Sequence, residues 1–186
     1  LCRAAALASG PGGRPPRLTR LRRDDTVFEQ GETPHVAGVL RRGYLRMERI
    51  QSDGRRSILG LATPGDLVGL VELDRPNYGL HCATDVEICV LDRARVLRLR
   101  ERSPRVAQIL FEEACRLHTA AQDLIWRRGA LSARERILAV LTGALQLFPV
   151  RRLPEGGVEV AIPVSRRDWA DLANTTVESI SRTLRQ

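Results

Sequence analysis

The chain has 186 residues, of which 43% are hydrophobic and only 4% aromatic. This length suits one ordinary domain or two small ones, and the composition excludes disordered and fibrous proteins. The longest apolar stretches, such as 138–141, are far shorter than the ~18 residues that indicate a membrane span. We therefore expect a soluble globular protein without a membrane partner.

Thirty basic and twenty-two acidic residues give a net charge of +8, and all thirty basic residues are arginines. A basic excess favours a polyanionic partner, although arginines spread over solvated surfaces give the same count. The four cysteines are widely spaced, without a Cys-x-x-Cys pair or a secretory leader. These features indicate the reducing cytoplasm.

The first two parts of the chain differ in composition. Residues 1–20 are rich in proline, glycine and arginine, which predicts a flexible N-terminal segment. Over 21–103, short apolar or alternating runs separated by glycines predict an antiparallel β-roll. Its clearest hairpin runs over 36–50 and returns over 57–61, because Asp53-Gly54 supplies the positive φ of a tight turn.

A long helix is predicted over 104–130, followed by a domain over 131–186. Apolar residues recur in the helix at heptad spacing, which favours a two-helix dimer contact, although one helix packed on its own roll has the same pattern. The predicted seam consists of Leu110, Ala114, Leu117, Ala121 and Leu124. Gly129 suits the helix C-cap, and Ser132 with Glu135 forms a capping-box pattern that begins a second helix through Leu147.

Two short helices are predicted at the end of the chain, after a turn and a short strand over 150–162. A Ser165-x-x-Asp168 cap begins the first helix, Asn174 suits a tight turn, and Thr176 caps the second. In the second helix, Val177, Ile180 and Leu184 are expected to face inward. Its opposite face carries Glu178, Ser181, Arg182 and Arg185. This arrangement is typical of a helix-turn-helix that reads a major groove, although a helical hairpin with a solvated face has the same spacing.

The run from Val177 to Arg182, preceded by Asp168-x-x-x-Leu172, resembles the DNA-reading element of the CRP/FNR family of bacterial transcription regulators. The roll carries further matching motifs: Val27-Phe28, Gly31-Glu32, Gly43 and Pro64-Gly65-Asp66-Leu67-Val68-Gly69. The resemblance implies an α+β fold with an N-terminal antiparallel β-roll of the cyclic-nucleotide-binding kind, a long dimerisation helix and a C-terminal winged helix-turn-helix. Because the sequence stops four residues after Arg182, we expect the wing to be missing. RNA polymerase is the further partner that the family implies.

The branch of the family follows from particular residues. Leu70 follows Gly69, and Asn77-Tyr78-Gly79 stands where the cyclic-AMP branch has its phosphate-binding Arg-Ser motif. Without these anchors a buried phosphate is uncompensated, so we expect no cyclic AMP. The reading helix matches the FNR/FixK pattern instead, which implies TTGAT-type half-sites. The expected DNA contacts are Thr176, Glu178, Ser179, Ser181, Arg182 and Arg185, with Thr176 and Ser179 touching phosphates.

The sensor is the least defined part of the sequence. FNR-type members hold a [4Fe-4S] cluster with three N-terminal cysteines and one in the roll, and the resemblance assigns Cys2 and Cys89 as two candidate ligands. The cluster needs four ligands and is therefore possible only if cysteines lie upstream; otherwise Cys89 is a small buried hydrophobe. Haem is a weaker alternative, because His35, His81 and His118 are single histidines.

These observations predict a homodimeric DNA-binding transcription regulator that reads palindromic TTGAT-like promoter sites. A redox or gas signal sensed on the roll side would control it. The alternative is a β-roll module that binds a ligand or protein without touching DNA. The sequence carries no nucleophile elbow, zinc-protease motif or phosphate loop, so we expect no enzyme.

Overall fold

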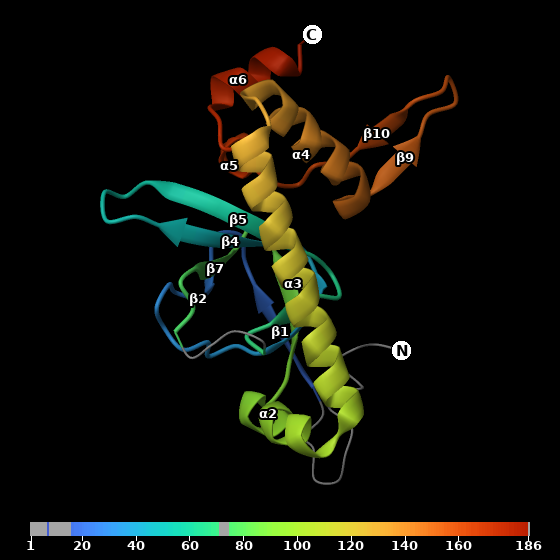
Figure 1. Ribbon diagram of the computed structural model, residues 1–186. Helices are drawn as coiled ribbons and strands as arrows, with labels where there is room; N and C mark the ends of the chain where they lie inside the picture. Colours follow the sequence, from blue (N-terminus) through green and yellow to red (C-terminus); the bar gives the residue numbers. More distant parts are fainter. Residues whose placement is uncertain (1–6, 8–15, 71–74, 186) are drawn as a thin grey trace.

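The computed structural model describes residues 7, 16–70 and 75–185. It shows a β-roll, a long helix that runs along it, and a C-terminal helical head at the far end of that helix (Figure 1). This α+β architecture is the predicted one. Among the described residues, no helix is both long enough and apolar enough to cross a membrane.

Two four-stranded antiparallel sheets form the roll. One has the order β1-β8-β3-β6, with β1 at Arg17–Leu21, β3 at Gly38–Arg42, β6 at Leu67–Val68 and β8 at Val86–Val90. The other has the order β2-β7-β4-β5, with β2 at Thr26–Phe28, β4 at Leu45–Ile50, β5 at Arg56–Ala62 and β7 at Gly79–Cys82. Apolar side chains from both sheets, including Phe28, Leu40, Leu45 and Ile88, fill the space between them.

Two predicted boundaries in the roll were wrong. Residues 17–20, expected to be flexible, belong to β1, which pairs along its whole length with β8. Its backbone hydrogen bonds hold it there, although three of its five residues are exposed and give no strong apolar signal. The hairpin arm expected over 36–50 is divided at Gly43, one of the glycines that separate the runs of the roll; its φ is +83°. As a result β4 pairs with β5, whereas β3 pairs with β6 and β8.

Helix α2 (Arg93–Arg102) and the long helix α3 (Pro104–Ala130) pack on the outside of the first sheet. Leu110 of α3 contributes to this core. The Glu113 side chain is fully buried and accepts a hydrogen bond from the Leu67 N–H at 3.3 Å. Arg116 bridges Glu113 at 2.7 Å and Asp66 at 3.3 Å. The motif at 64–69 therefore docks the roll onto α3.

The head contains α4 (Ala133–Leu147), a hairpin of β9 (Val150–Arg152) and β10 (Val158–Val160), α5 (Arg166–Leu172) and α6 (Val177–Thr183). The predicted capping box at Ser132 and the predicted cap at Ser165 are both present, and the cap at Ser165 is also a capping box. The predicted C-cap at Gly129 was wrong, because α3 continues through Ala130 and Leu131 is the cap. The single strand expected over 150–162 is this two-stranded hairpin.

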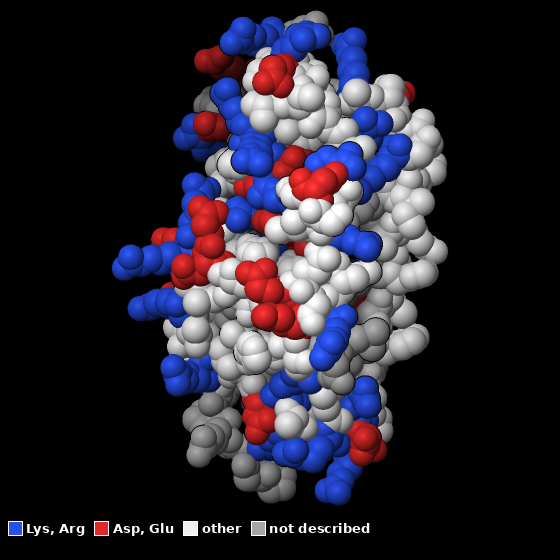
Figure 2. Space-filling model, turned by 90° about the vertical axis from the view of Figure 1, so that its left-hand side faces the viewer, with Lys and Arg blue, Asp and Glu red and all other residues white. Residues whose placement is uncertain are grey.

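The head rests against the roll. Tyr44 of the roll packs edge-on against Phe148 with the ring centroids 4.9 Å apart, inside a shared apolar cluster. Arg23 donates a hydrogen bond to the Pro163 carbonyl at 2.7 Å. At the end of α3, Arg128 donates to the Ile58 carbonyl of β5 at 3.0 Å. Basic side chains gather at the α6 end and the α2 end of the molecule, while acidic and basic side chains intermingle between them (Figure 2).

Candidate nucleic-acid interface

The two short helices at the end of the chain form a helix-turn-helix whose turn is set by local side chains. The Ser165 hydroxyl accepts a hydrogen bond from the Asp168 N–H at 3.0 Å, which begins α5. Asn174 adopts a left-handed conformation with φ of 48°, which asparagine tolerates better than most residues. Thr176 then caps α6 by accepting a hydrogen bond from the Ser179 N–H at 3.2 Å. Each of these three signals is readable in the sequence.

One residue that holds the turn was not predicted. The guanidinium of Arg136, in the first turns of α4, donates to the Ala173 carbonyl at 2.9 Å and to the Asn174 carbonyl at 3.1 Å. It also donates to the Leu131 carbonyl at 2.7 Å, in the link between α3 and α4. No sequence spacing points to this contact, because the partners are backbone oxygens 37 and 38 residues away.

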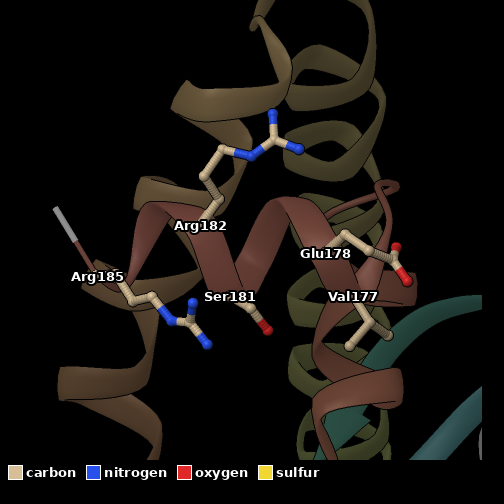
Figure 3. A pocket seen from close by; sticks show the side chains of 5 residues that line it. All are labelled: Val177, Glu178, Ser181, Arg182 and Arg185. Carbon is tan, nitrogen blue, oxygen red and sulfur yellow. The ribbon is translucent and has the colours of Figure 1, made fainter.

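Four of the predicted contact residues line a shallow hollow of about 540 Å³ together with Val177 (Figure 3). They are Glu178, Ser181 and Arg182 of α6 and Arg185 just after it. Glu178, Arg182 and Arg185 are exposed, and Ser181 is half-buried. Ile180, on the opposite side of the helix, is fully buried in the head core. Leu184, expected inward, is 47% exposed because α6 ends at Thr183. The helix therefore presents one polar face to solvent.

The charges on this face suit a DNA groove. Hydrogen bonds from its own backbone N–H and from Thr176 lower the pKa of Glu178, so its carboxylate is an acceptor at neutral pH. The predicted phosphate contacts, Thr176 and Ser179, bond to each other through their hydroxyls at 3.2 Å. Arg166 and Arg167, exposed at the start of α5, are further cations that the sequence reasoning did not single out.

The sequence of this chain is similar to a known domain family and to two bacterial regulators. Residues 18–103 match the family model described as a cyclic nucleotide-binding domain. The chain is 34% identical over 162 residues to the nitrogen fixation regulation protein FixK of Bradyrhizobium diazoefficiens, and 31% identical over 159 residues to the transcriptional activatory protein AadR of Rhodopseudomonas palustris. Each alignment covers 86% of this chain and 66% of the relative. The chain belongs to the CRP/FNR family, in its FixK-like branch.

The solved structures agree on the fold. The structure of FixK2 from Bradyrhizobium japonicum superposes with a TM-score of 0.83 over 92% of this chain and 83% of that chain, at 24% sequence identity. A mutant of CooA from Carboxydothermus hydrogenoformans gives a TM-score of 0.76 over 97% of this chain and 81% of that chain, at 14% identity. This chain spans about two thirds of the length of the FixK and AadR relatives.

In this CRP/FNR-family chain, the predicted dimer seam divides between two sides of α3. Leu110 is only 6% exposed and belongs to the core that α3 forms with its own roll. Leu117 and Leu124, which follow it at steps of seven residues, are half-buried on the same side. Ala114 and Ala121 are exposed. The three leucines therefore face the chain's own roll, whereas the two alanines face away from it.

A second apolar stripe on α3 is exposed and shifted by one residue from the predicted seam. Phe111 is 69% exposed and Ile125 is 73% exposed. With the exposed residues Ala114, His118 and Ala121 they recur at steps of three and four, which is heptad spacing. This exposed α3 stripe consists of Phe111, Ala114, His118, Ala121 and Ile125.

The described cysteines do not form a cluster site of the FNR type. Cys2 lies outside the described residues. Cys89 sits in the middle of its sheet, paired with Leu18 on one side and Val39 on the other, and packs on the core beside α3. Burial raises the pKa of the Cys82 thiol to about 12. Among the described residues, no group of three or more histidine, cysteine, aspartate or glutamate side chains is arranged to hold a metal ion.

The position after Gly69, which the sequence analysis examined for a cyclic-AMP anchor, is apolar. Leu70 is 2% exposed and packs in the core shared with α2 and α3. In the core between the two sheets, the ring centroid of Tyr78 lies 5.8 Å from that of Phe28. Neither side chain supplies the cation that a cyclic phosphate requires.

Proposed function

We propose that this protein is a homodimeric transcription regulator whose α6 reads palindromic DNA sites. One observation carries the proposal: the side chains of Glu178, Arg182 and Arg185 are exposed. The opposite side of the capped helix α6 is buried in the head core. The names of the relatives support it, since FixK is described as a regulator of nitrogen fixation and AadR as a transcriptional activatory protein. Such a regulator works in the cytoplasm, where the DNA is.

The chemistry of α6 suggests how bases are read. The Arg182 guanidinium can donate to both acceptors of a guanine, and the ionised Glu178 can accept from a cytosine amino group. The FixK-like pattern of these residues supports TTGAT-type half-sites. Thr176, Ser179, Arg166 and Arg167 are suited to phosphate contacts, which fix the register of the helix on the duplex.

Dimerisation would place two heads on one duplex. We assign the contact to the exposed α3 stripe, because its apolar residues have the spacing of a parallel helix pair and lack a partner within the described residues. A twofold axis through this contact would set two half-sites about one helical turn apart, ~34–36 Å. RNA polymerase is the expected partner of the DNA-bound dimer.

The roll would carry the regulatory signal. The apolar Leu70 supports a signal other than cyclic AMP, and the resemblance to FNR-type regulators implies a redox or gas signal. Iron and acid-labile sulfide, measured per protomer on complete protein purified without oxygen, test the cluster. About four of each would require cysteines outside the described residues. Values near zero would assign Cys89 to packing and leave haem or another ligand as the sensor.

Fluorescence anisotropy with a labelled TTGAT palindrome tests the proposal directly. We expect tight binding to the palindrome and much weaker binding to a scrambled duplex, and affinity should fall steeply as salt rises, because arginines release counterions from phosphates. Equal affinity for both duplexes would contradict base reading. A lack of binding at low salt would favour the alternative, a roll module that binds a ligand or protein only.

A further inference from the structure

A buried group of charges joins the β-roll to the DNA-reading head. The roll–head ion cluster consists of Arg46 and Glu48 of β4, Arg56 of β5, and Asp168 and Asp171 of α5. The side chains of Arg46, Glu48 and Asp168 are 9%, 6% and 3% exposed. Five ionised side chains at one boundary are unusual, because charges removed from water must be partnered.

Two arginines of the roll bind two carboxylates of the head. Arg46 reaches Asp168 at 3.4 Å and also binds Asp24 of the roll at 2.9 Å. Arg56 binds Asp168 at 2.9 Å and donates from Nε to Asp171 at 2.8 Å. Asp168 is therefore held by both arginines. Because guanidinium–carboxylate bonds are directional, they fix the angle of α5 on the roll more strictly than the neighbouring apolar contact between Tyr44 and Phe148.

The cluster is connected to the reading helix through short, rigid steps. Asp168 also accepts a hydrogen bond from the Ser165 N–H at 3.2 Å, so the carboxylate that binds the roll also caps α5. The turn after α5 is fastened by Arg136 and leads directly into α6. Any rotation of α5 against the roll would therefore move Arg182 and Glu178 by a similar angle.

We propose that Arg46 and Arg56 are positioning residues for DNA recognition, which act through Asp168 and Asp171 to hold each reading head at one angle to its roll. This inference rests on the proposed function. In a dimer the two rolls are fixed by α3, so the head angle sets the distance between the two reading helices. The cluster thereby determines which spacing between half-sites the dimer accepts.

The test is spacing selectivity. The DNA series keeps the two half-sites constant and lengthens or shortens the spacer between them by one or two base pairs. Each palindrome is titrated with wild-type protein and with the double variant Arg56→Gln/Asp171→Asn, which removes one opposed charge pair. Wild type should bind the best spacer at least about tenfold more tightly than the others, a difference typical of one misplaced contact. The variant should keep most of its affinity for a single half-site, but its affinities for palindromes with different spacers should differ only about twofold to threefold.

Two further variants separate positioning from general damage. The conservative variant Arg56→Lys should keep much of the selectivity, because it leaves a positive charge between Asp168 and Asp171. The control Glu159→Gln removes an exposed ion pair with Arg151, 2.7 Å long, in the β9–β10 hairpin, and should leave spacing selectivity unchanged. A folded double variant that retains wild-type selectivity would overturn the proposal.

Hydrogen exchange gives a readout that does not depend on DNA. If the cluster holds the head, the double variant should exchange faster in peptides over 44–62 and 164–173, whereas α4 in the head core stays protected. Unchanged exchange at both surfaces would also overturn the proposal. If wild type fails to prefer the palindrome while the exchange result holds, the proposed function fails and the cluster remains a head-holding contact.

Discussion

The guanidinium of Arg136 on α4 donates a hydrogen bond of 3.1 Å to the backbone carbonyl of Asn174, the left-handed residue at the centre of the helix-turn-helix. With its bonds to Ala173 and Leu131, the same side chain connects the reading turn to the link that follows α3. The turn that orients α6 is thus held from outside the helix-turn-helix itself.

Replacing Arg136 with methionine should loosen this turn. Methionine keeps the aliphatic stem but removes three charge-assisted hydrogen bonds, so we expect a loss of roughly 2–3 kcal/mol in the free energy of unfolding. The loss of affinity for DNA should exceed the loss expected from the unfolded fraction alone, because α6 is no longer held in one orientation. Urea unfolding and anisotropy titration measure the two effects. The matched control is Arg134→Met, an exposed arginine of the same helix, and an equal effect of both variants would contradict the role of Arg136.

Arg182 should read bases, and its removal should therefore change sequence preference as well as affinity. We expect Arg182→Ala to cost about 1–3 kcal/mol on the cognate half-site and to flatten the preference at one base position. Binding to half-sites substituted one position at a time checks this. Arg20→Ala is the control, because Arg20 lies on the roll and pairs with Glu87. A uniform loss across all sequences would assign Arg182 to phosphate contact instead.

The exposed α3 stripe should be the dimer contact. Ile125→Glu would place two like charges opposite each other in the seam and should weaken the dimer by roughly 3 kcal/mol or more. Sedimentation velocity at several protein concentrations measures the shift to monomer. Thr119→Glu adds the same charge at an exposed α3 position well away from the stripe and should leave the dimer intact. A dimer that survives Ile125→Glu would place the contact elsewhere.

What the sequence predicts well is governed by local rules. Ser132, Ser165 and Thr176 cap helices because each needs only a backbone N–H three residues away. Asn174 marks the turn for an equally local reason, its tolerance of a left-handed backbone. The family motifs likewise lie in short runs, so the fold class and the reading helix were both predicted.

What the sequence predicts poorly depends on which partner each side chain meets. Helix α3 is apolar on two sides, one against its own roll and one exposed, and the two stripes differ by a single residue, or about 100° of rotation. Periodicity alone therefore predicted one seam that contains both Leu110, which faces the roll, and Ala114, which is exposed. The pairing of Arg46 with Asp168 spans 122 residues, and neither residue carries a local signal for it.

Acid should weaken the roll–head contact only at low pH. Burial alone would raise the pKa of Asp168, but the hydrogen bond with Ser165 and the charges of Arg46 and Arg56 outweigh it and hold that pKa below its usual value. A depressed pKa in the folded state means that the ionised Asp168 contributes its full stability above the ordinary pKa of about 4. This contribution is lost as the pH falls through the folded-state pKa.

The variant Asp168→Asn makes this dependence measurable. Asparagine keeps the oxygen that accepts from the Ser165 N–H but removes the charge that binds the two arginines. At neutral pH we expect the variant to be less stable than wild type by about 3 kcal/mol, since it breaks a buried ion pair. In urea unfolding between pH 7 and pH 2.5, this gap should stay constant down to about pH 4 and then narrow by up to about 1.4 kcal/mol per pH unit, because protonated Asp168 resembles asparagine. A gap that does not narrow at the acid end would show that the stability comes from the shape of the side chain and not from its charge.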